Sequence, residues 1–201
     1  MDPSATDTID VPIATNVDPI MPNLSDEEET VEAMMPILDS IVRTMCIGDT
    51  AAYQPQDPEF FWNMLYLMGV NWGHTHPLVE QTEEYVKVPR QVMQEFASAA
   101  FLDYSDLLPV PESMAGSLWY DEGLDAYCLA YSDKGDTETK LESVAAGADG
   151  SITAVVNLYE TPDTFLNMVE FVLVANPYVD GISEPTYFYT VRSATLAVME
   201  G

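Results

Sequence analysis

The sequence predicts an α+β domain in which two or three N-terminal helices pack on one face of a C-terminal antiparallel β-meander of five or six strands. Up to about residue 112, apolar residues recur at three- and four-residue spacing, which is typical of helices. From residue 117 onward they alternate, and short turn-like pieces separate the segments. Helices followed by strands indicate an α+β fold. The 201 residues suit a single domain at 25–201, with a helical half at 25–112 and a sheet half at 117–198.

The first 24 residues form a segment of their own, because they carry four Pro, four Asp and no Lys or Arg. Their few apolar residues are interrupted too often to form a stripe, so we expect a disordered, acidic, Pro-containing tether at 1–24. The segment has neither the cationic start nor the apolar core of a signal peptide. Two interpretations stay open: a cytosolic protein with a flexible end, or an exported chain whose leader is missing.

The first helix begins at a capping box, Ser25-Asp-Glu-Glu28, in which the serine hydroxyl and the last glutamate each accept a backbone N–H. Pro36 should kink this helix because it lacks a backbone donor, and Gly48 should end it. The expected apolar stripe consists of Val31, Met34, Met35, Leu38, Ile41, Val42 and Met45.

Two further helices are expected before residue 112. Asp57 and Pro58 are a common pair at a helix start, and the helix that follows is apolar over more than half of its circumference. A short extended piece at 85–88 then leads to Pro89 and the third helix. The residues expected in the core are Phe60, Phe61, Met64, Leu65, Leu67, Met68, Val92, Met93, Phe96, Ala97, Ala100 and Phe101.

The sheet half contains six candidate strands joined by short turns, which predicts an antiparallel meander. Ile152, Ala154 and Val156 alternate with more polar neighbours, as expected for a sheet with one covered face. The candidate strands are 117–120, 127–131, 139–146, 151–159, 165–174 and 186–198.

The charge of the chain excludes two classes of partner. Asp and Glu number 34 against six Lys and Arg, so the net charge is −28. Nucleic acids and anionic lipid surfaces both require clustered Lys or Arg, which this chain lacks. No apolar run reaches the roughly 18 residues of a membrane span. Repulsion between the negative charges of different molecules predicts a soluble monomer. In the alternative, functional interpretation, the negative charge attracts a cationic protein, a basic wall polymer or divalent cations.

His74 and His76 form the most specific polar pattern in the chain. Histidines two residues apart on an extended segment point the same way, and Glu80, Glu83 or Glu84 could complete a three-ligand zinc site. The competing interpretation is a polar loop after the second helix. Because nothing in the spacing determines a third ligand, we predict no metal and no cofactor.

Cys46 and Cys128 allow either a disulfide bond, which would need an oxidising compartment, or two separate buried thiols. The sequence favours the second interpretation. Neither cysteine has a histidine or a cation beside it in sequence, so neither is expected to act as a nucleophile. The sequence motifs of nucleotide-binding loops, serine hydrolases and zinc proteases are all missing.

Aromatic residues are concentrated in the sheet half, where tyrosines on the solvent side of a sheet can bind a peptide or a sugar. We expect the exposed side of the last strands to be this surface, with Tyr187 and Tyr189 as the ligand-binding candidates. The aromatic residues concerned are Trp119, Tyr120, Tyr127, Tyr131, Tyr159, Phe165, Phe171, Tyr178, Tyr187, Phe188 and Tyr189.

The order of several short phrases resembles that of uncharacterised exported or lipoprotein-type domains of gut Firmicutes. The resemblance implies an α+β fold and an extracytoplasmic location, and it covers roughly residues 30–198. It assigns no activity and no functional residue. The phrases are Asp57-Pro-Glu-Phe-Phe-Trp62, Val86-Lys-Val-Pro89, Leu108-Pro-Val-Pro111, Tyr120-Asp-Glu, Asn176-Pro-Tyr178 and Phe188-Tyr-Thr-Val191.

These observations together favour a non-enzymatic, acidic domain of the cell envelope that binds a protein or a wall component. The first alternative is a small metal-dependent hydrolase that uses His74 and His76. The second is a cytosolic structural or interaction domain.

Overall fold

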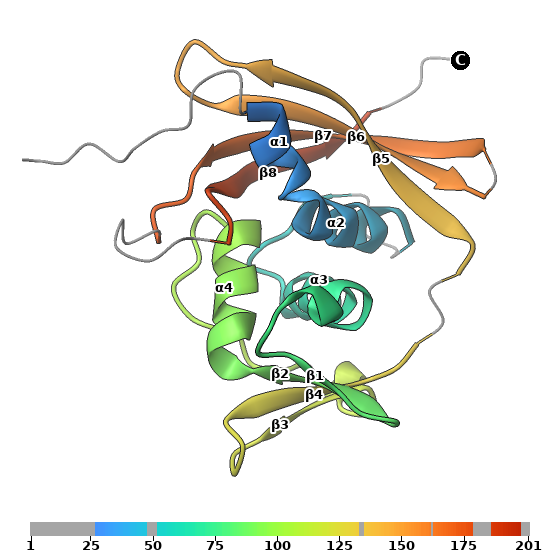
Figure 1. Ribbon diagram of the computed structural model, residues 1–201, viewed down its shortest axis with the longest axis vertical. Coiled ribbons are helices and arrows are strands. Elements are labelled where there is room, and N and C mark those ends of the chain that lie inside the picture. The colour runs from blue at the N-terminus through green and yellow to red at the C-terminus, as the bar shows by residue number, and fades with distance from the viewer. Residues whose placement is uncertain (1–26, 48–51, 133–134, 162, 179–185, 198–201) are drawn as a thin grey trace, which may run out of the picture.

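The computed structural model of the chain describes residues 27–47, 52–132, 135–161, 163–178 and 186–197. In these residues a layer of helices lies between two four-stranded antiparallel sheets, one toward each end of the long axis (Figure 1). The predicted α+β class is confirmed. The predicted meander is correct in part: four of its strands form one sheet with helices on one face, but the first two belong to a second sheet, so the helices are enclosed between two sheets. The tether predicted at 1–24 lies outside the described residues.

Pro36 separates two helices where the sequence predicted one kinked helix. Helix α1 spans Glu27–Glu32 and α2 spans Met35–Ile47, so the proline occupies the first turn of α2, where its missing N–H does not disrupt the helix. The carbonyl of Met34 accepts hydrogen bonds from the backbone N–H groups of Ile37 and Leu38, at 2.9 and 3.0 Å. Ser25 and Gly48, the expected ends of the first helix, lie outside the described residues.

Helix α3 spans Pro58–Trp72 and begins as predicted. The side chain of Asp57 accepts a hydrogen bond from the backbone N–H of Phe60, at 2.9 Å. A 3₁₀ turn, η2, follows at Gly73–Thr75, helix α4 spans Arg90–Ala100, and a second 3₁₀ turn, η3, spans Glu112–Met114. None of the described helices is both long and apolar enough to cross a membrane.

The smaller sheet has the strand order β1-β2-β4-β3, so its central strands come from distant parts of the chain. The extended piece predicted before the third helix is the central strand β2, and the first two strands predicted for the meander are β3 and β4. Helix α3 is apolar around more than half of its circumference, and it contacts helices α2 and α4 as well as β2 and β4 of this second sheet. The strands are β1 (Glu80–Gln81), β2 (Tyr85–Pro89), β3 (Leu118–Asp121) and β4 (Ala126–Ala130).

The larger sheet is the predicted meander, reduced to four strands in the order β5-β6-β7-β8. Its inner face is apolar: Ala154, Val156, Phe171 and Val191 are fully buried against the helices. The alternation predicted for β6 is confirmed on this face. The strands are β5 (Thr137–Ala146), β6 (Ile152–Glu160), β7 (Thr164–Ala175) and β8 (Tyr189–Leu196).

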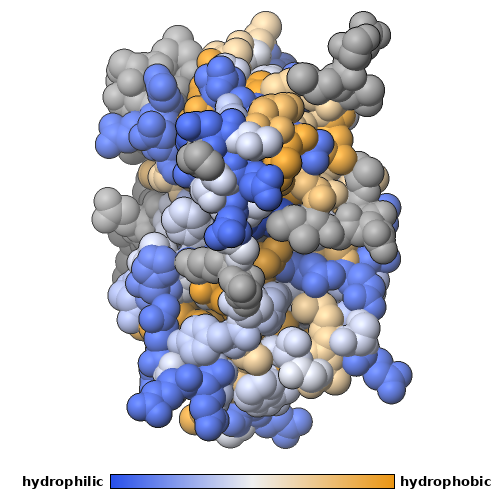
Figure 2. All heavy atoms as spheres, turned by 90° about the vertical axis from the view of Figure 1, so that its right-hand side faces the viewer, coloured by the Kyte–Doolittle hydropathy of each residue, from blue (hydrophilic) through white to orange (hydrophobic). Residues whose placement is uncertain are grey.

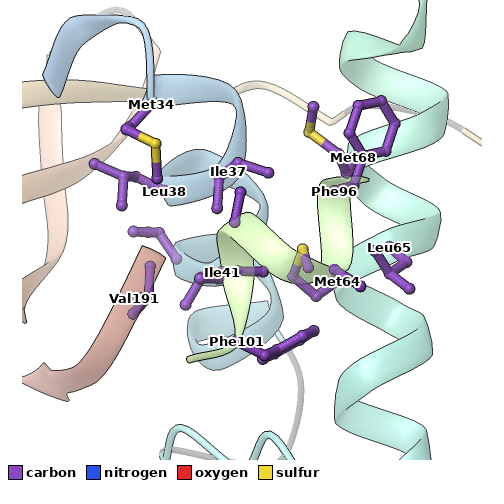
Figure 3. Packing of buried hydrophobic residues seen from close by; sticks show 14 of the residues in the cluster. Met34, Ile37, Leu38, Ile41, Met64, Leu65, Met68, Phe96, Phe101 and Val191 are labelled. Carbon is purple, nitrogen blue, oxygen red and sulfur yellow. The ribbon is translucent and has the colours of Figure 1, made fainter. Parts of the chain in front are cut away.

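One continuous core joins the three layers. Helix α2 contacts β5 and β6 of the larger sheet, α3 contacts β2 and β4 of the smaller one, and α4 contacts both sheets. Figure 3 shows Ile41 of α2, Met64 of α3 and Phe101 after α4 gathered between the helices, with Val191 of β8 on the same side as Ile41. The helical layer therefore fixes both sheets in one body.

Candidate functional site

The smaller sheet has a buried inner face and a polar–aromatic outer face, which points away from the helices (bottom of Figure 1). On β2, Val86 and Val88 are fully buried, whereas the alternating residues Tyr85 and Lys87 are partly exposed. Because side chains alternate along a strand, Tyr85 and Lys87 belong to the outer face.

Four residues form a row across the outer face, one from each strand. Glu80 of β1 is opposite Lys87 of β2, Lys87 is opposite Cys128 of β4, and Cys128 is opposite Trp119 of β3. Neighbouring strands are about 4.8 Å apart, so the row from Glu80 to Trp119 is about 14 Å long. The row therefore has a carboxylate at one end and an indole at the other.

Tyr85 and Trp119 meet across the central strand β4. Their ring centroids are 5.4 Å apart and the rings are inclined at 71°, which is an edge-to-face contact. The central strand carries only small side chains on this face, including Cys128 and Ala130, so the two large rings can approach each other above it. Trp119 keeps 40% of its surface exposed. We call the surface formed by Glu80, Tyr85, Lys87, Trp119 and Cys128 the aromatic face.

Charged and polar groups border the aromatic face. Lys87 forms an ion pair with Glu80, and this hydrogen bond raises the pKa of the Lys87 ammonium. Asp121 follows Trp119 on the same side of β3, and its carboxylate accepts the backbone N–H of Gly123 at 2.9 Å. Carboxylates therefore border both ends of the row.

An exposed tyrosine, Tyr131, lies beside the turn between β1 and β2. The Tyr131 hydroxyl donates a hydrogen bond to the carbonyl of Thr82 at 2.9 Å, and the ring remains exposed. Glu83 and Glu84 are exposed in the same turn. This corner therefore adds a further ring and two carboxylates to the surface near Tyr85.

The exposure predicted for Tyr187 and Tyr189 is wrong. Their exposed fractions are only 6% and 2%, and burial raises the pKa of the Tyr187 hydroxyl. Tyr187 packs edge-on against Phe96 of α4, whereas the residue between the tyrosines, Phe188, is exposed. Buried and exposed side chains do alternate from Tyr187 to Tyr189, but the tyrosines are on the buried side instead of the exposed side. A shift of one residue exchanges the two faces of a strand. Ligand binding by these tyrosines stays an untested prediction.

His74 and His76 do not converge on a shared site. His74 is exposed on η2. His76 is largely buried: its Nδ1 accepts the backbone N–H of Leu78 at 3.2 Å, and its Nε2 lies 3.4 Å from a carboxylate oxygen of Glu95. Across the part of the chain that the structure describes, no group of three His, Cys, Asp or Glu side chains could hold a metal ion. His76 therefore ties the loop after α3 to helix α4.

Cys46 and Cys128 are both free thiols. Cys46 lies near the end of α2 and Cys128 on β4, and α3 lies between these elements (Figure 1). Burial raises the pKa of the Cys46 thiol to about 11 and also raises the pKa of Cys128. A high pKa keeps a thiol protonated and unreactive, so both cysteines have the chemistry of packing residues.

Sequence reasoning placed Trp119 on a strand but missed Tyr85 and Lys87 as its neighbours. The signal that could have found them is the alternation from Tyr85 to Val88, in which valines alternate with a ring and a cation. Their position beside Trp119 depends on β4 pairing with both β2 and β3, which no local pattern encodes.

The chain is thus a three-layer α+β domain with an exposed aromatic face on its smaller sheet. Comparison of the chain with protein-family models, with curated proteins and with solved structures gives no significant match. The resemblance to exported envelope domains therefore stays a prediction that rests on short phrases.

Proposed function

We propose that this protein is a non-enzymatic binding domain of the cell envelope that holds a protein or a wall component on its aromatic face. The observation that carries the proposal is the contact of Tyr85 with Trp119 on an outer sheet face, where Trp119 stays 40% exposed. Aromatic rings supply much of the energy of binding surfaces, because they bury a large area with few rotatable bonds. Neither ring belongs to the core that holds the fold together.

The chemistry of the nucleophilic groups supports a role without catalysis. Burial raises the pKa of both thiols, and His76 uses both ring nitrogens for contacts within the domain. The acidic, proline-containing composition of residues 1–24 supports attachment to the envelope through a tether.

Photo-crosslinking in the native cell tests the binding surface even though the ligand is unidentified. Benzoylphenylalanine replaces Trp119 in one variant and Leu166 in a matched control, since these side chains are 40% and 41% exposed and lie on different sheets. The proposal predicts a discrete adduct from position 119 and none from position 166. Mass spectrometry of the adduct then distinguishes a protein from a wall fragment.

Equal labelling from the two positions would contradict the aromatic face as the binding surface. An adduct only with an intracellular protein would contradict the envelope location and favour the cytosolic interaction domain.

A further inference from the structure

We infer that the ligand of the aromatic face is a cationic segment of a partner protein, whose Lys or Arg side chains lie on the rings of Trp119 and Tyr85. This inference rests on the proposed function. A cation within about 6 Å of an aromatic ring centre is attracted by the ring face, and tryptophan is the strongest such partner. The charge of the domain, the pairing of its cations and the layout of the row all favour this ligand class.

The described cations of the domain already form ion pairs within it. Each of the five Lys and Arg residues in the described part of the chain has a carboxylate partner, and the sixth, Lys134, lies outside it. An anionic ligand would therefore have to break an internal ion pair, whereas a cationic ligand meets a surface with a large excess of carboxylates. The pairs are Arg43–Asp39, Lys87–Glu80, Arg90–Asp106, Lys140–Glu138 and Arg192–Asp149.

The dimensions of the row fit an extended peptide. An extended chain rises about 3.3 Å per residue, so side chains four residues apart are about 13 Å apart and point to the same side. This spacing matches the row of about 14 Å that ends at Glu80 and Trp119. One cationic side chain can thus lie on the indole beside Asp121, while a second reaches Glu80 at the other end.

Substitution of Lys87 should change the affinity in opposite directions for a cationic ligand and for other ligands. Lys87 lies in the row between Glu80 and Trp119, two residues from Tyr85 on the same strand, and its ammonium already pairs with the Glu80 carboxylate that an incoming cation would use. Removing this charge should therefore strengthen the binding of a cationic peptide. A neutral sugar or an anionic ligand would instead lose a hydrogen-bond donor, so the same substitution would weaken its binding.

Binding of two synthetic peptides to the purified full chain tests the inference. One peptide alternates lysine with serine, and the other carries glutamine in place of lysine. We expect the lysine peptide alone to bind, with an affinity that falls as salt is raised. Trp119→Ala should weaken binding about tenfold. Lys87→Met should strengthen it about threefold, Glu80→Gln should weaken it, and Leu166→Ala should leave it unchanged.

The outcomes separate this inference from the proposed function. Equal binding of the two peptides, or weaker binding by Lys87→Met, overturns the cationic ligand but leaves the aromatic face as a binding surface. Binding of the lysine peptide that is unchanged in Trp119→Ala overturns the site, because diffuse attraction to the acidic surface then explains it. If neither peptide binds, the cationic ligand is overturned, and crosslinking from position 119 still tests the proposed function independently.

Discussion

The two sheets cover opposite sides of one helical layer, but they are attached to it by different chemistry. The larger sheet is joined to the helices by apolar packing and by a buried polar cluster. The smaller sheet is joined mainly through close apolar contact, to which the Tyr66 hydroxyl of α3 adds a single hydrogen bond to the carbonyl of Ala130 on β4, at 2.7 Å; no buried ion pair comparable to Asp39–Arg43 lies at that boundary among the described residues. The difference matters because hydrogen bonds are directional and specify one alignment, whereas apolar contact specifies mainly shape.

The polar cluster centres on Asp39, whose carboxylate is buried between α2 and β5. It accepts hydrogen bonds from Arg43 Nε, Trp72 Nε1 and Thr139 Oγ1, each at 2.8 Å. Arg43 in turn donates to the side chain and the carbonyl of Thr137, at 2.6 and 2.9 Å. Both charges are therefore compensated by hydrogen bonds, and the cluster fixes where β5 lies along α2.

The outer faces of the sheets differ as well. On the larger sheet, half-exposed residues such as Thr153, Val155 and Val172 have the β-branched side chains that strands favour for structural reasons. In Figure 2, hydrophobic residues gather toward the upper end, where this sheet lies, whereas polar and intermediate residues predominate at the lower end. Strand propensity explains these β-branched residues but not the exposed indole of Trp119 on the smaller sheet, which is why we assign binding to the smaller sheet.

The largest effect is expected from breaking the polar cluster. Asp39→Ala leaves the buried Arg43 without its counter-charge and removes the acceptor of Trp72 and Thr139. Such changes typically cost about 3–5 kcal/mol of unfolding free energy. Chemical denaturation of the variant and the native chain measures the loss.

The double variant Asp39→Leu, Arg43→Met separates charge burial from packing. It should be more stable than Asp39→Ala, because no uncompensated charge remains in the core. If the unfolding free energy of Asp39→Ala lay within about 0.5 kcal/mol of that of the native chain, the role given to the cluster would be contradicted.

A smaller effect is expected at the apolar boundary. Gly69 of α3 faces the smaller sheet, and a Cβ at this position would overlap Leu129 Cδ1 and lie 3.4 Å from Val88 Cγ2. Gly69→Ala gains helix propensity, but crowding in a packed core costs about 1–3 kcal/mol, so we expect a net loss of about 1 kcal/mol.

Gly116→Ala is the matched control, because a Cβ at position 116 meets no atom within 4 Å. Thermal unfolding of the two variants should show a lower midpoint for Gly69→Ala alone. Equal midpoints would mean that the smaller sheet packs more loosely on α3 than we describe.

The sequence predicted elements whose signals are local. The pair Asp57–Pro58 located the start of α3, and the alternation from Ile152 to Leu158 located β6 with its buried face. The division into two sheets was missed because β2 pairs with β4, which follows only after α4 and a long loop. Pairing between distant segments depends on the whole fold and leaves little trace in either segment.

The candidate site was predicted less well for the same reason. Trp119 was recognised as aromatic on a strand, but its neighbours Tyr85 and Lys87 come from β2. The exposed phase was reversed at Tyr187 and Tyr189, because an all-aromatic run does not indicate which side the helices cover. Asp39 went unnoticed as well, since a single acid within an apolar helix stripe resembles a solvent-facing residue until Arg43 and β5 are in place.

The smallest effect concerns Cys128, at the centre of the aromatic face, and its cover by Trp119. Cys128 lies on the outer face between Lys87 and Trp119, yet only 2% of its surface is exposed. Removing the indole should admit solvent, lower the pKa of the thiol toward its ordinary value of 9.0 and raise its reaction rate. We therefore expect Trp119→Ala to speed the alkylation of Cys128 by iodoacetamide several-fold at about pH 8.

The second cysteine is an internal control in the same experiment. Cys46 lies on the far side of α3, and its pKa of about 11 should keep it slow in every variant. Peptide mass spectrometry distinguishes the two sites, and Leu166→Ala should change neither rate. Faster alkylation of both cysteines would indicate general loosening of the fold. An unchanged alkylation rate at Cys128 would show that Trp119 does not cover this thiol. It would contradict the arrangement in which Tyr85 and Trp119 make an edge-to-face contact above β4.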